Sequence, residues 1–188
     1  MANKQLIKFI FELAQLRRIK HEGFRLSGVD CPLSVADHSL RAAQIGFFLA
    51  RMEKYENPYE IVTMLVFHDI GECRTGDIHK VANRYIKADE EGAVKDQLQP
   101  LEDGSKLLSL WKQCEKRTSI PGVIAKDADY LEKAFTAKEY TETGHKSAVD
   151  WINNVRKHLQ TKSAKVMLEE MVKMTSTDWW DGLKLITN

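Results

Sequence analysis

The sequence has few cysteines and no long apolar run. Its three cysteines, Cys31, Cys73 and Cys114, are an odd number and include no Cys-x-x-Cys pair, which argues against a disulfide framework and a thiolate zinc cluster. Free thiols are typical of a reducing compartment. No segment approaches the roughly 20 apolar residues that span a bilayer, and the N-terminus opens into an amphipathic pattern without a signal peptide. We therefore expect a cytoplasmic protein that has no membrane partner.

An excess of basic charge is also missing. Lys and Arg total 28 and Asp and Glu total 27, which gives a formal net charge of +1. A protein that coats nucleic acid would show a strong basic excess, so we expect no nucleic acid polymer as a partner. The glycine-rich motifs that bind phosphates and dinucleotides are absent, as is the Gly-x-Ser-x-Gly nucleophile motif. Any chemistry must therefore come from side chains that face into the fold.

What the sequence does contain is helical periodicity along almost its whole length. Apolar residues recur at three- and four-residue spacing, and 43% of the 188 residues are hydrophobic, which suits one globular domain. We expect an all-α fold with a single domain over residues 1–175 and a C-terminal tail over 176–188. Residues 75–100 are polar, and we expect a loop with one or two short helices there. The other predicted helices cover residues 3–20, 34–54, 57–69, 101–116, 121–143, 147–160 and 163–174.

Two of these helices have clear start signals. Ser34 followed by Asp37 is typical of a capping box, in which the Ser oxygen accepts from the N3 amide and the acid reaches back. Asn57, Pro58 and Glu60 provide an N-cap, a proline at N1 and an acid at N3. The two helices that carry the most interesting histidines therefore begin at defined positions.

Two of the six histidines lie in apolar helical surroundings. His38 falls in the first turn of the capped helix, and His68 ends an apolar stretch with Asp69 beside it. A buried charged aspartate is costly unless it is paired or bound to a metal. One interpretation is that these three residues meet around a divalent ion between helices. The alternative is that His38 and His68 are ordinary core histidines, because a His-Asp pair is common.

Two acids follow the His-Asp pair. Glu72 is four residues after His68 and shares its face if the helix continues, and Asp77 follows the Thr75-Gly76 turn. Either acid could activate a water, protonate a leaving oxygen or hold a second ion. The remaining histidines lie among polar residues, and we expect them on the surface: His21, His79, His145 and His158.

The combined order of four segments resembles a known family. The segments are Ser34-Val35-Ala36-Asp37-His38-Ser39-Leu40, His68-Asp69-Ile70-Gly71-Glu72, Thr75-Gly76-Asp77-Ile78 and Lys126-Asp127-Ala128-Asp129-Tyr130-Leu131-Glu132. They resemble the HD-domain superfamily of phosphohydrolases. Within it, the chain is similar to the small single-domain 5'-deoxynucleotidases of the YfbR-like and HD-domain-containing-protein-2 group. The resemblance covers roughly residues 6–145 and implies an HD-domain helical bundle.

This resemblance implies a metal-dependent phosphohydrolase and assigns roles to residues. It implies that Glu72 and Asp77 are catalytic or hold a second ion. It also implies that Arg18, near the end of the first helix, contacts the phosphate. Among the ions, Co, Mn, Mg and Zn stay open. The implied ligands of the divalent ion are His38, His68, Asp69 and Asp129.

Two of these assignments have competitors within the chain. Helical periodicity places Asp127 nearer the apolar stripe and Asp129 nearer the far side, whereas the family resemblance favours Asp129. Arg17 is hard to separate from Arg18, and a basic pair at a helix end is also explained by the helix dipole alone.

The predicted activity is removal of the 5'-phosphate from a deoxyribonucleoside 5'-monophosphate, a small-molecule nucleotide substrate. The resemblance implies a homodimer, and the apolar residues in the later helices also favour one. One alternative is hydrolysis of nucleoside di- or triphosphates to release pyrophosphate, which would require a long basic channel. Another is a metal-binding helical scaffold without turnover.

Overall fold

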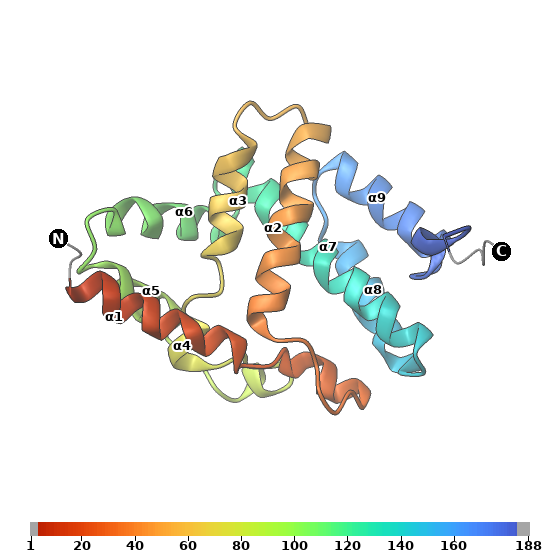
Figure 1. Cartoon of the computed structure of the whole chain (residues 1–188), viewed down its shortest axis with the longest axis horizontal. Coiled ribbons are helices and arrows are strands. Elements are labelled where there is room, and N and C mark those ends of the chain that lie inside the picture. The colour runs from red at the N-terminus through yellow and green to blue at the C-terminus, as the bar shows by residue number, and fades with distance from the viewer. Residues whose placement is uncertain (1–3, 184–188) are drawn as a thin grey trace.

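A computed structural model of the chain describes residues 4–183, and within that range the protein is built from helices (Figure 1). The only extended pairing found over this range is an isolated antiparallel bridge between Lys20 and Ser34. The all-α prediction is confirmed. The α-helices are α1 (Lys4–Leu13), α2 (Val35–Met52), α3 (Pro58–Val66), α4 (Glu72–Thr75), α5 (Glu90–Leu98), α6 (Gly104–Lys116), α7 (Ile120–Glu142), α8 (Val149–His158) and α9 (Lys162–Lys173). The 3₁₀ helices are η1 (Ala14–Arg17), η2 (Glu22–Ser27), η3 (Ala82–Arg84), η4 (Lys146–Ala148) and η5 (Asp178–Trp180).

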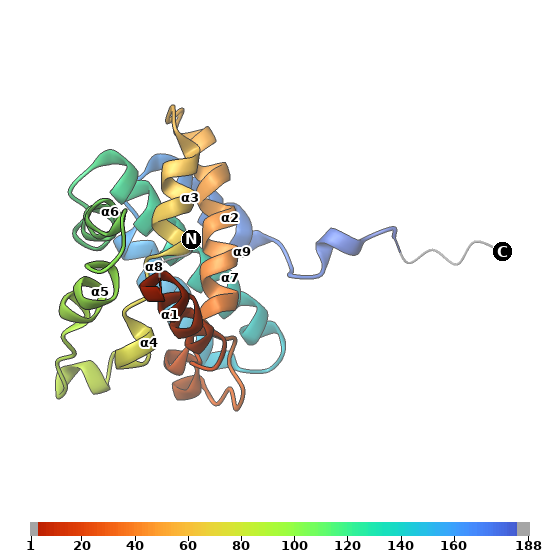
Figure 2. The same cartoon turned by 60° about the vertical axis from the view of Figure 1, so that its left-hand side comes forward.

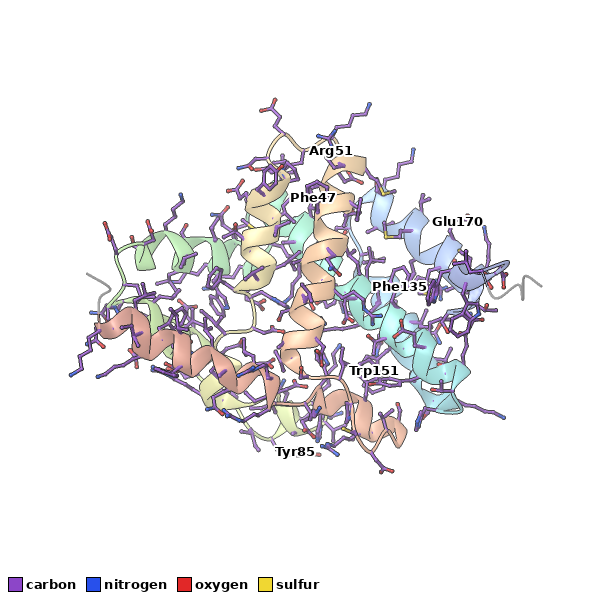
Figure 3. All side chains as sticks on the ribbon, in the orientation of Figure 1. Phe47, Arg51, Tyr85, Phe135, Trp151 and Glu170 are labelled. Carbon is purple, nitrogen blue, oxygen red and sulfur yellow. The ribbon has the colours of Figure 1, made fainter. Side chains whose placement is uncertain are left out.

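Helices α2, α3 and α7 form the centre of the bundle. All three pack against one another, with α5 and α6 on one side and α8 and α9 on the other (Figure 1). Gly46 lets α2 and α3 approach closely, because a Cβ at this position would lie 2.3 Å from Leu65 Cδ1. On α8, Trp151 (Figure 3) stacks on Phe24 of η2 with 5.4 Å between ring centroids. The central helices therefore hold their side chains at short range from three directions.

The apolar core is divided into two clusters. The larger one lies among α2, α3, α7, α8 and α9 and includes Leu49, Leu65, Ala128, Leu131 and Leu168. The smaller one lies beneath α1, α5 and α6 and consists of Phe9, Leu16, Val35, Ile70, Val94, Leu98 and Trp111. Leu65 belongs to the larger cluster and Ile70 to the smaller one, so the segment between them crosses the boundary. That segment contains His68 and Asp69.

Both predicted start signals lie where helices begin. The capping box is confirmed: the Asp37 amide donates to Ser34 Oγ at 3.2 Å, and the Ser34 amide donates to Asp37 Oδ2 at 2.9 Å. Pro58 is the first residue of α3, with Asn57 at the N-cap, although the Asn57 side chain makes no capping hydrogen bond. The entry to α2 is therefore rigid at the turn that carries His38.

Two helices are shorter than predicted. The helix predicted over residues 3–20 ends as an α-helix at Leu13 and continues as η1 to Arg17; residue 3 lies outside the described part. The helix predicted to reach Asp69 ends at Val66. In both places the apolar periodicity continues beyond the helix because the chain still packs against the smaller cluster, through Leu16 and Ile70. Apolar periodicity marks which residues are buried, and at both places the buried residues continue past the end of the α-helix.

The chain leaves the bundle after α9. Figure 2 shows the segment that contains η5 running outward, away from the other helices, and Trp179 is 72% exposed. The predicted tail over 176–188 is described as far as residue 183, and residues 184–188 lie outside the described part. Across residues 4–183, each helix is too short or too polar to cross a bilayer.

Candidate metal centre and active-site cleft

Four side chains from three parts of the bundle converge at the boundary of the two clusters. His38 projects from the first turns of α2, His68 and Asp69 from the turn after α3, and Asp129 from the middle of α7. The side chains of His38, His68 and Asp129 are completely buried, and that of Asp69 is 13% exposed. These are the four residues that the family resemblance singles out as metal ligands.

The distances among these four side chains are nearly uniform. His38 Nε2 lies 3.2 Å from His68 Nε2, 3.1 Å from Asp129 Oδ1 and 3.6 Å from Asp69 Oδ2. His68 Nε2 lies 3.0 Å from Asp69 Oδ2 and 3.7 Å from Asp129 Oδ1. Neighbouring ligands of an ion with bonds of about 2.1 Å are roughly 3.0–3.4 Å apart. Three of these five distances fall in that range and the other two exceed it by a few tenths of an ångström, so the four atoms lie close to the spacing of a coordination shell.

The rings of both histidines are oriented by contacts at Nδ1. His68 Nδ1 lies 2.7 Å from the carbonyl oxygen of Leu65, a geometry in which Nδ1–H donates and Nε2 keeps its lone pair toward the centre. His38 Nδ1 contacts the Glu132 carboxylate. Such contacts fix the tautomer and increase the basicity of the nitrogen that faces a metal.

Glu132 is itself held from the far side. The Arg41 guanidinium donates to Glu132 Oε1 from Nε at 2.9 Å and from Nη2 at 2.8 Å, and Thr136 Oγ1 donates to the same oxygen at 2.7 Å. Burial raises the pKa of Glu132, but the charges of His38 and Arg41 outweigh it and lower the pKa to about 2. A chain of contacts therefore runs from the surface of α2 and α7 to His38.

Asp129 is the buried acid at the centre. Lys126 Nζ lies 3.2 Å from its Oδ2 and Lys133 Nζ lies 2.6 Å from its Oδ1. Although burial raises the pKa of Asp129, these two lysines hold it well below the ordinary value. Both carboxylate oxygens are fully buried, and the side chains within ion-pairing distance of them include Lys126, Lys133 and His38. Buried oxygens of this kind are suited to binding a cation.

Asp127, the competitor of Asp129, has a different role. Its Oδ2 accepts hydrogen bonds from the amides of Gln160 and Thr161 at 3.0 and 2.7 Å and from Thr161 Oγ1 at 2.8 Å. Thr161 is the N-cap of α9. Asp127 therefore joins α7 to the start of α9, and its oxygens are occupied by backbone donors.

A cleft of about 470 Å³ has Asp69 in its lining. Acids predominate in its lining: Asp69, Glu72, Asp77, Glu90 and Glu115, against the basic Lys87, Lys126 and Lys133. The remaining lining comes largely from the segment between α4 and α5, which includes Ile78, Asn83 and Ile86. Lys126 Nζ also lies 2.6 Å from Glu115 Oε1, so one lysine connects the buried centre to the wall of the cleft.

The acids of the cleft influence one another. Burial, together with the charges of Asp69 and Asp77, raises the pKa of Glu72 to about 10, and burial and Asp69 raise that of Glu90 to about 7. Asp77 is fixed by the Glu22 amide, which donates to its Oδ2 at 2.6 Å. Burial and the neighbouring acids therefore favour the protonated form of Glu72.

The comparisons with known proteins agree with this geometry. A family model described as an HD domain matches residues 13–172. The chain belongs to the HD-domain family. The chain is 30% identical over 148 residues to the 5'-deoxynucleotidases HDDC2 of Bos taurus and Homo sapiens; each alignment covers 76% of this chain and 71% and 72% of those proteins. A solved structure of a conserved hypothetical protein from Pyrococcus furiosus superimposes with a TM-score of 0.75 at 26% identity, covering 89% of this chain and 99% of that one.

An HD domain implies a divalent ion, and the donor set here fits one. Two imidazole nitrogens and two carboxylate oxygens suit Mn, Fe, Co, Ni or Zn, and the histidine nitrogens lie 3.0–3.7 Å from the carboxylate oxygens. The predicted acids Glu72 and Asp77 both line the adjoining cleft, although α4 is a separate helix and does not continue α3. Glu72 therefore reaches the cleft by a turn at Gly71 rather than by helical periodicity.

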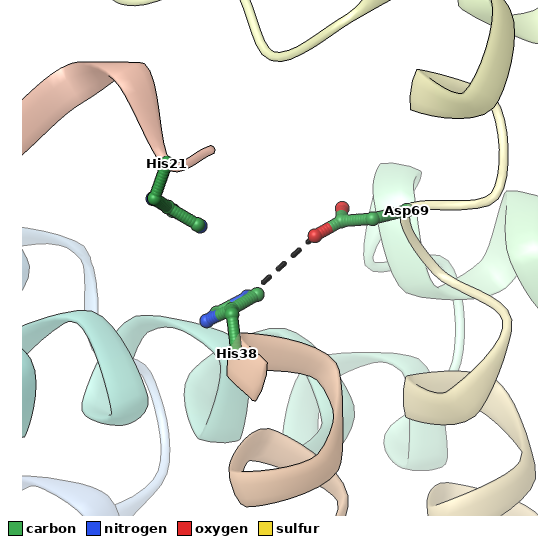
Figure 4. Close-up of side chains that lie close together, drawn as sticks. All are labelled: His21, His38 and Asp69. Atoms are coloured by element: carbon green, nitrogen blue, oxygen red, sulfur yellow. Dashed lines mark ion pairs between the residues drawn. The ribbon is translucent and has the colours of Figure 1, made fainter. Parts of the chain in front are cut away.

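The structure places two other predicted residues elsewhere. Arg18 is exposed at the C-cap of η1 and is not among the residues that line the cleft. His21, which was expected on the surface, is only 8% exposed. Figure 4 shows its ring beside His38 and Asp69. The surface prediction was wrong for His21, because the loop after η1 folds back onto the start of α2.

The sequence analysis missed the lysines and the glutamate that surround Asp129 and His38. Lys126 and Lys133 are at positions i−3 and i+4 from Asp129, so helical spacing alone places both on its side of α7. Glu132, three residues after Asp129, shares that side of α7 as well, but its contact with His38 is tertiary. Glu90 had no local signal, because it meets the other residues of the cleft only through the fold.

Proposed function

We propose that the chain is a metal-dependent phosphomonoesterase that hydrolyses deoxyribonucleoside 5'-monophosphates to nucleoside and phosphate. The observation that carries this proposal is the convergence of two imidazoles and two carboxylates beneath a cleft that Glu72 and Asp77 line. The names of the HDDC2 relatives support the substrate class.

His38, His68, Asp69 and Asp129 would hold the divalent ion. Such an ion supplies Lewis-acid stabilisation of the negative charge that develops on a phosphate during hydrolysis. The buried Nδ1 contacts of both histidines keep their Nε2 atoms aimed at one point. Rigid placement of this kind avoids reorganisation when the substrate binds.

The cleft residues would manage protons and orientation. Glu72, buried against Asp69 and Asp77, can deliver a proton to the leaving 5'-oxygen, and Asp77 can accept one from the attacking water; together they could instead hold a second ion. Lys133 is the cation nearest to the centre on the cleft side and can bind a phosphate oxygen. A phosphate contact by Arg18 stays a prediction, since this side chain lies in solvent.

The charge of the cleft favours a monophosphate. Only three lysines line the cleft, and one of them, Lys126, already pairs with Glu115. The cleft therefore offers few cations to a long polyphosphate chain, whereas a single phosphate needs only the ion and one or two cations. A volume of about 470 Å³ lies within the usual range of small-ligand sites, about 300–1,000 Å³. Hydrolysis of di- or triphosphates is the less favoured activity on this basis.

We also propose a single HD domain over residues 1–175 followed by the tail, a homodimer, and a cytoplasmic location. The homodimer is supported by exposed apolar side chains on the later part of the chain, such as Val166, Met174 and Trp179, which are 50%, 53% and 72% exposed. Light scattering after size exclusion at micromolar concentration tests it, and a clean monomer would contradict it. Three free cysteines fit a reducing compartment.

Phosphate release from a panel of nucleoside mono-, di- and triphosphates tests the activity. The protein is stripped with a chelator, reloaded with Co, Mn, Mg or Zn, and compared with His68→Ala and with the exposed control His158→Ala. We expect release from deoxynucleoside monophosphates that needs metal and disappears only in His68→Ala. Metal binding without turnover of any substrate would support the metal-binding scaffold without activity. Pyrophosphate release would support the hydrolysis of nucleoside di- or triphosphates.

A further inference from the structure

His21 is a histidine at the metal centre for which the mechanism above has no use. It precedes η2, it is only 8% exposed, and its ring lies 4.6 Å from that of His38, centroid to centroid. Figure 4 shows the ring facing the space that His38 and Asp69 border. A histidine in that place needs an explanation beyond filling volume, because an apolar side chain would fill it at lower cost.

The backbone holds His21 in place from both sides. Its amide donates to the carbonyl oxygen of Leu33 at 3.0 Å, and the Val35 amide donates to that of Ile19 at 3.0 Å. Together with the bridge between Lys20 and Ser34, these bonds tie the loop to the N-cap of α2. The same turn carries His38, so the two imidazoles belong to one small rigid unit.

The ring of His21 has few polar partners. It makes no hydrogen bond with any residue between 4 and 183, and the nearest carboxylate with which it pairs is Asp77, with 4.0 Å between Nδ1 and Oδ2. In contrast, a ring nitrogen of His21, one of His38 and an oxygen of Asp69 all lie within 4.8 Å of one another. Opposite ligands of an ion with bonds of about 2.1 Å are about 4.2 Å apart, so the 4.8 Å limit on these three atoms is close to the span of one coordination shell.

We propose that His21 is a further ligand of the divalent ion. This inference rests on the metal site of the proposed function and deepens it, because the centre then has three imidazoles and two carboxylates. A third nitrogen shifts preference from Mg, which favours oxygen ligands, toward Co, Zn and similar ions. His21 thus sets which metal the protein selects.

Counting the imidazole ligands by X-ray absorption on the Co-loaded full-length protein tests this directly. We expect three imidazoles in the wild type and in the exposed control His158→Gln, and two in His21→Gln. Chelator competition should show Co affinity reduced about tenfold or more in His21→Gln, with a smaller change for Mg. Free imidazole added to His21→Ala should restore the wild-type visible spectrum of bound Co.

The alternative is that His21 acts only by positioning Asp77. In that case Asp77→Asn would reproduce the spectral change of His21→Gln, and the imidazole count would stay the same in His21→Gln; this result overturns the proposal. Should His21→Gln fail to fold, ¹⁵N-histidine-labelled wild type titrated with Zn gives the answer. A His21 nitrogen that shifts to the metal-bound position supports the proposal, and one that does not move contradicts it.

These measurements need no substrate, so they separate the two proposals. A wild type that binds Co through three imidazoles but hydrolyses no phosphate ester refutes the phosphomonoesterase and leaves His21 as a ligand. A wild type that hydrolyses deoxynucleoside monophosphates with two imidazoles on the metal refutes the role of His21 alone. A wild type that binds no divalent ion refutes both.

Discussion

Asp127 and Asp129 are two residues apart on α7, and both are completely buried, yet they belong to different regions of the molecule. Asp127 faces α9, where amide and hydroxyl donors of Gln160 and Thr161 occupy its oxygens. Asp129 faces the cluster boundary, where it meets two histidines and two lysines.

The difference teaches that burial alone does not identify a functional acid. A buried carboxylate with backbone donors strengthens the fold, because its charge is neutralised by fixed dipoles. A buried carboxylate that is surrounded by side chains able to exchange partners is suited to binding a cation. The partners, rather than the degree of burial, distinguish the two regions.

The largest effect should come from Asp129→Asn. We expect phosphate release to fall by about 10³-fold or more and metal binding to be lost, while the helical circular dichroism is retained. The reason is that the amide removes one charged ligand without changing its shape. Metal content by mass spectrometry and turnover with deoxynucleoside monophosphates measure this, and a variant that keeps full metal content would contradict our assignment.

Asp127→Asn should lower stability and leave activity unchanged. We expect a loss of about 2–3 kcal/mol in the free energy of unfolding, because charged acceptors of buried donors are worth about that much, with turnover by the folded protein unchanged. Urea unfolding followed by circular dichroism gives the first number. A variant that is stable but inactive would mean that the two aspartates have been assigned in reverse.

Glu132→Gln tests whether the contact behind His38 matters for the ion. We expect metal affinity to fall about 10–100-fold, since the neutral amide no longer supports the imidazole through Nδ1. Competition with a chelator measures the affinity. Glu139→Gln is the matched control, because Glu139 also pairs with Arg41 but does not touch His38; an equal loss in both variants would contradict the proposed chain of contacts.

A comparison of Lys133→Met with Arg18→Ala tests whether the phosphate is bound by a lysine of the cleft or by an exposed arginine. We expect KM for a deoxynucleoside monophosphate to rise about tenfold in Lys133→Met, which corresponds to about 1.4 kcal/mol of a charge-assisted hydrogen bond. Because Arg18 is exposed and is not among the residues that line the cleft, its variant should differ little from the wild type. A large rise in KM for Arg18→Ala would instead support the phosphate contact by Arg18 that the family resemblance predicts.

The smallest effect concerns acid stability. The pKa of Glu132 is lowered to about 2 from an ordinary value of 4.5. Its stabilising contribution is therefore complete above pH 4.5 and is lost as the pH falls toward 2. We expect the free energy of unfolding of Glu132→Gln to fall less steeply than that of wild type between these two pH values. Urea unfolding at several pH values measures both slopes, and equal slopes would contradict the shift.

Much of the fold could be predicted from short-range signals. The capping box at Ser34, proline at the start of α3 and apolar periodicity along α7 are local, and each of them describes the structure well. The ends of α1 and α3 could not be read in this way, because the apolar residues beyond both ends stay buried although the α-helix has ended. His21 was misjudged for a related reason: its neighbours in sequence are polar, whereas its neighbours in space are His38 and Asp69.

The sequence by itself therefore determined the helical class and where the main chemical groups sit along the chain, since these depend on residues within one or two turns of each other. Only the tertiary structure decided which acid of α7 faces the metal centre, which lysines line the cleft and that His21 is buried there. Those outcomes depend on how α2, α3 and α7 cross and on a loop that returns to Ser34. Such contacts join residues far apart in sequence and leave no periodic pattern in it.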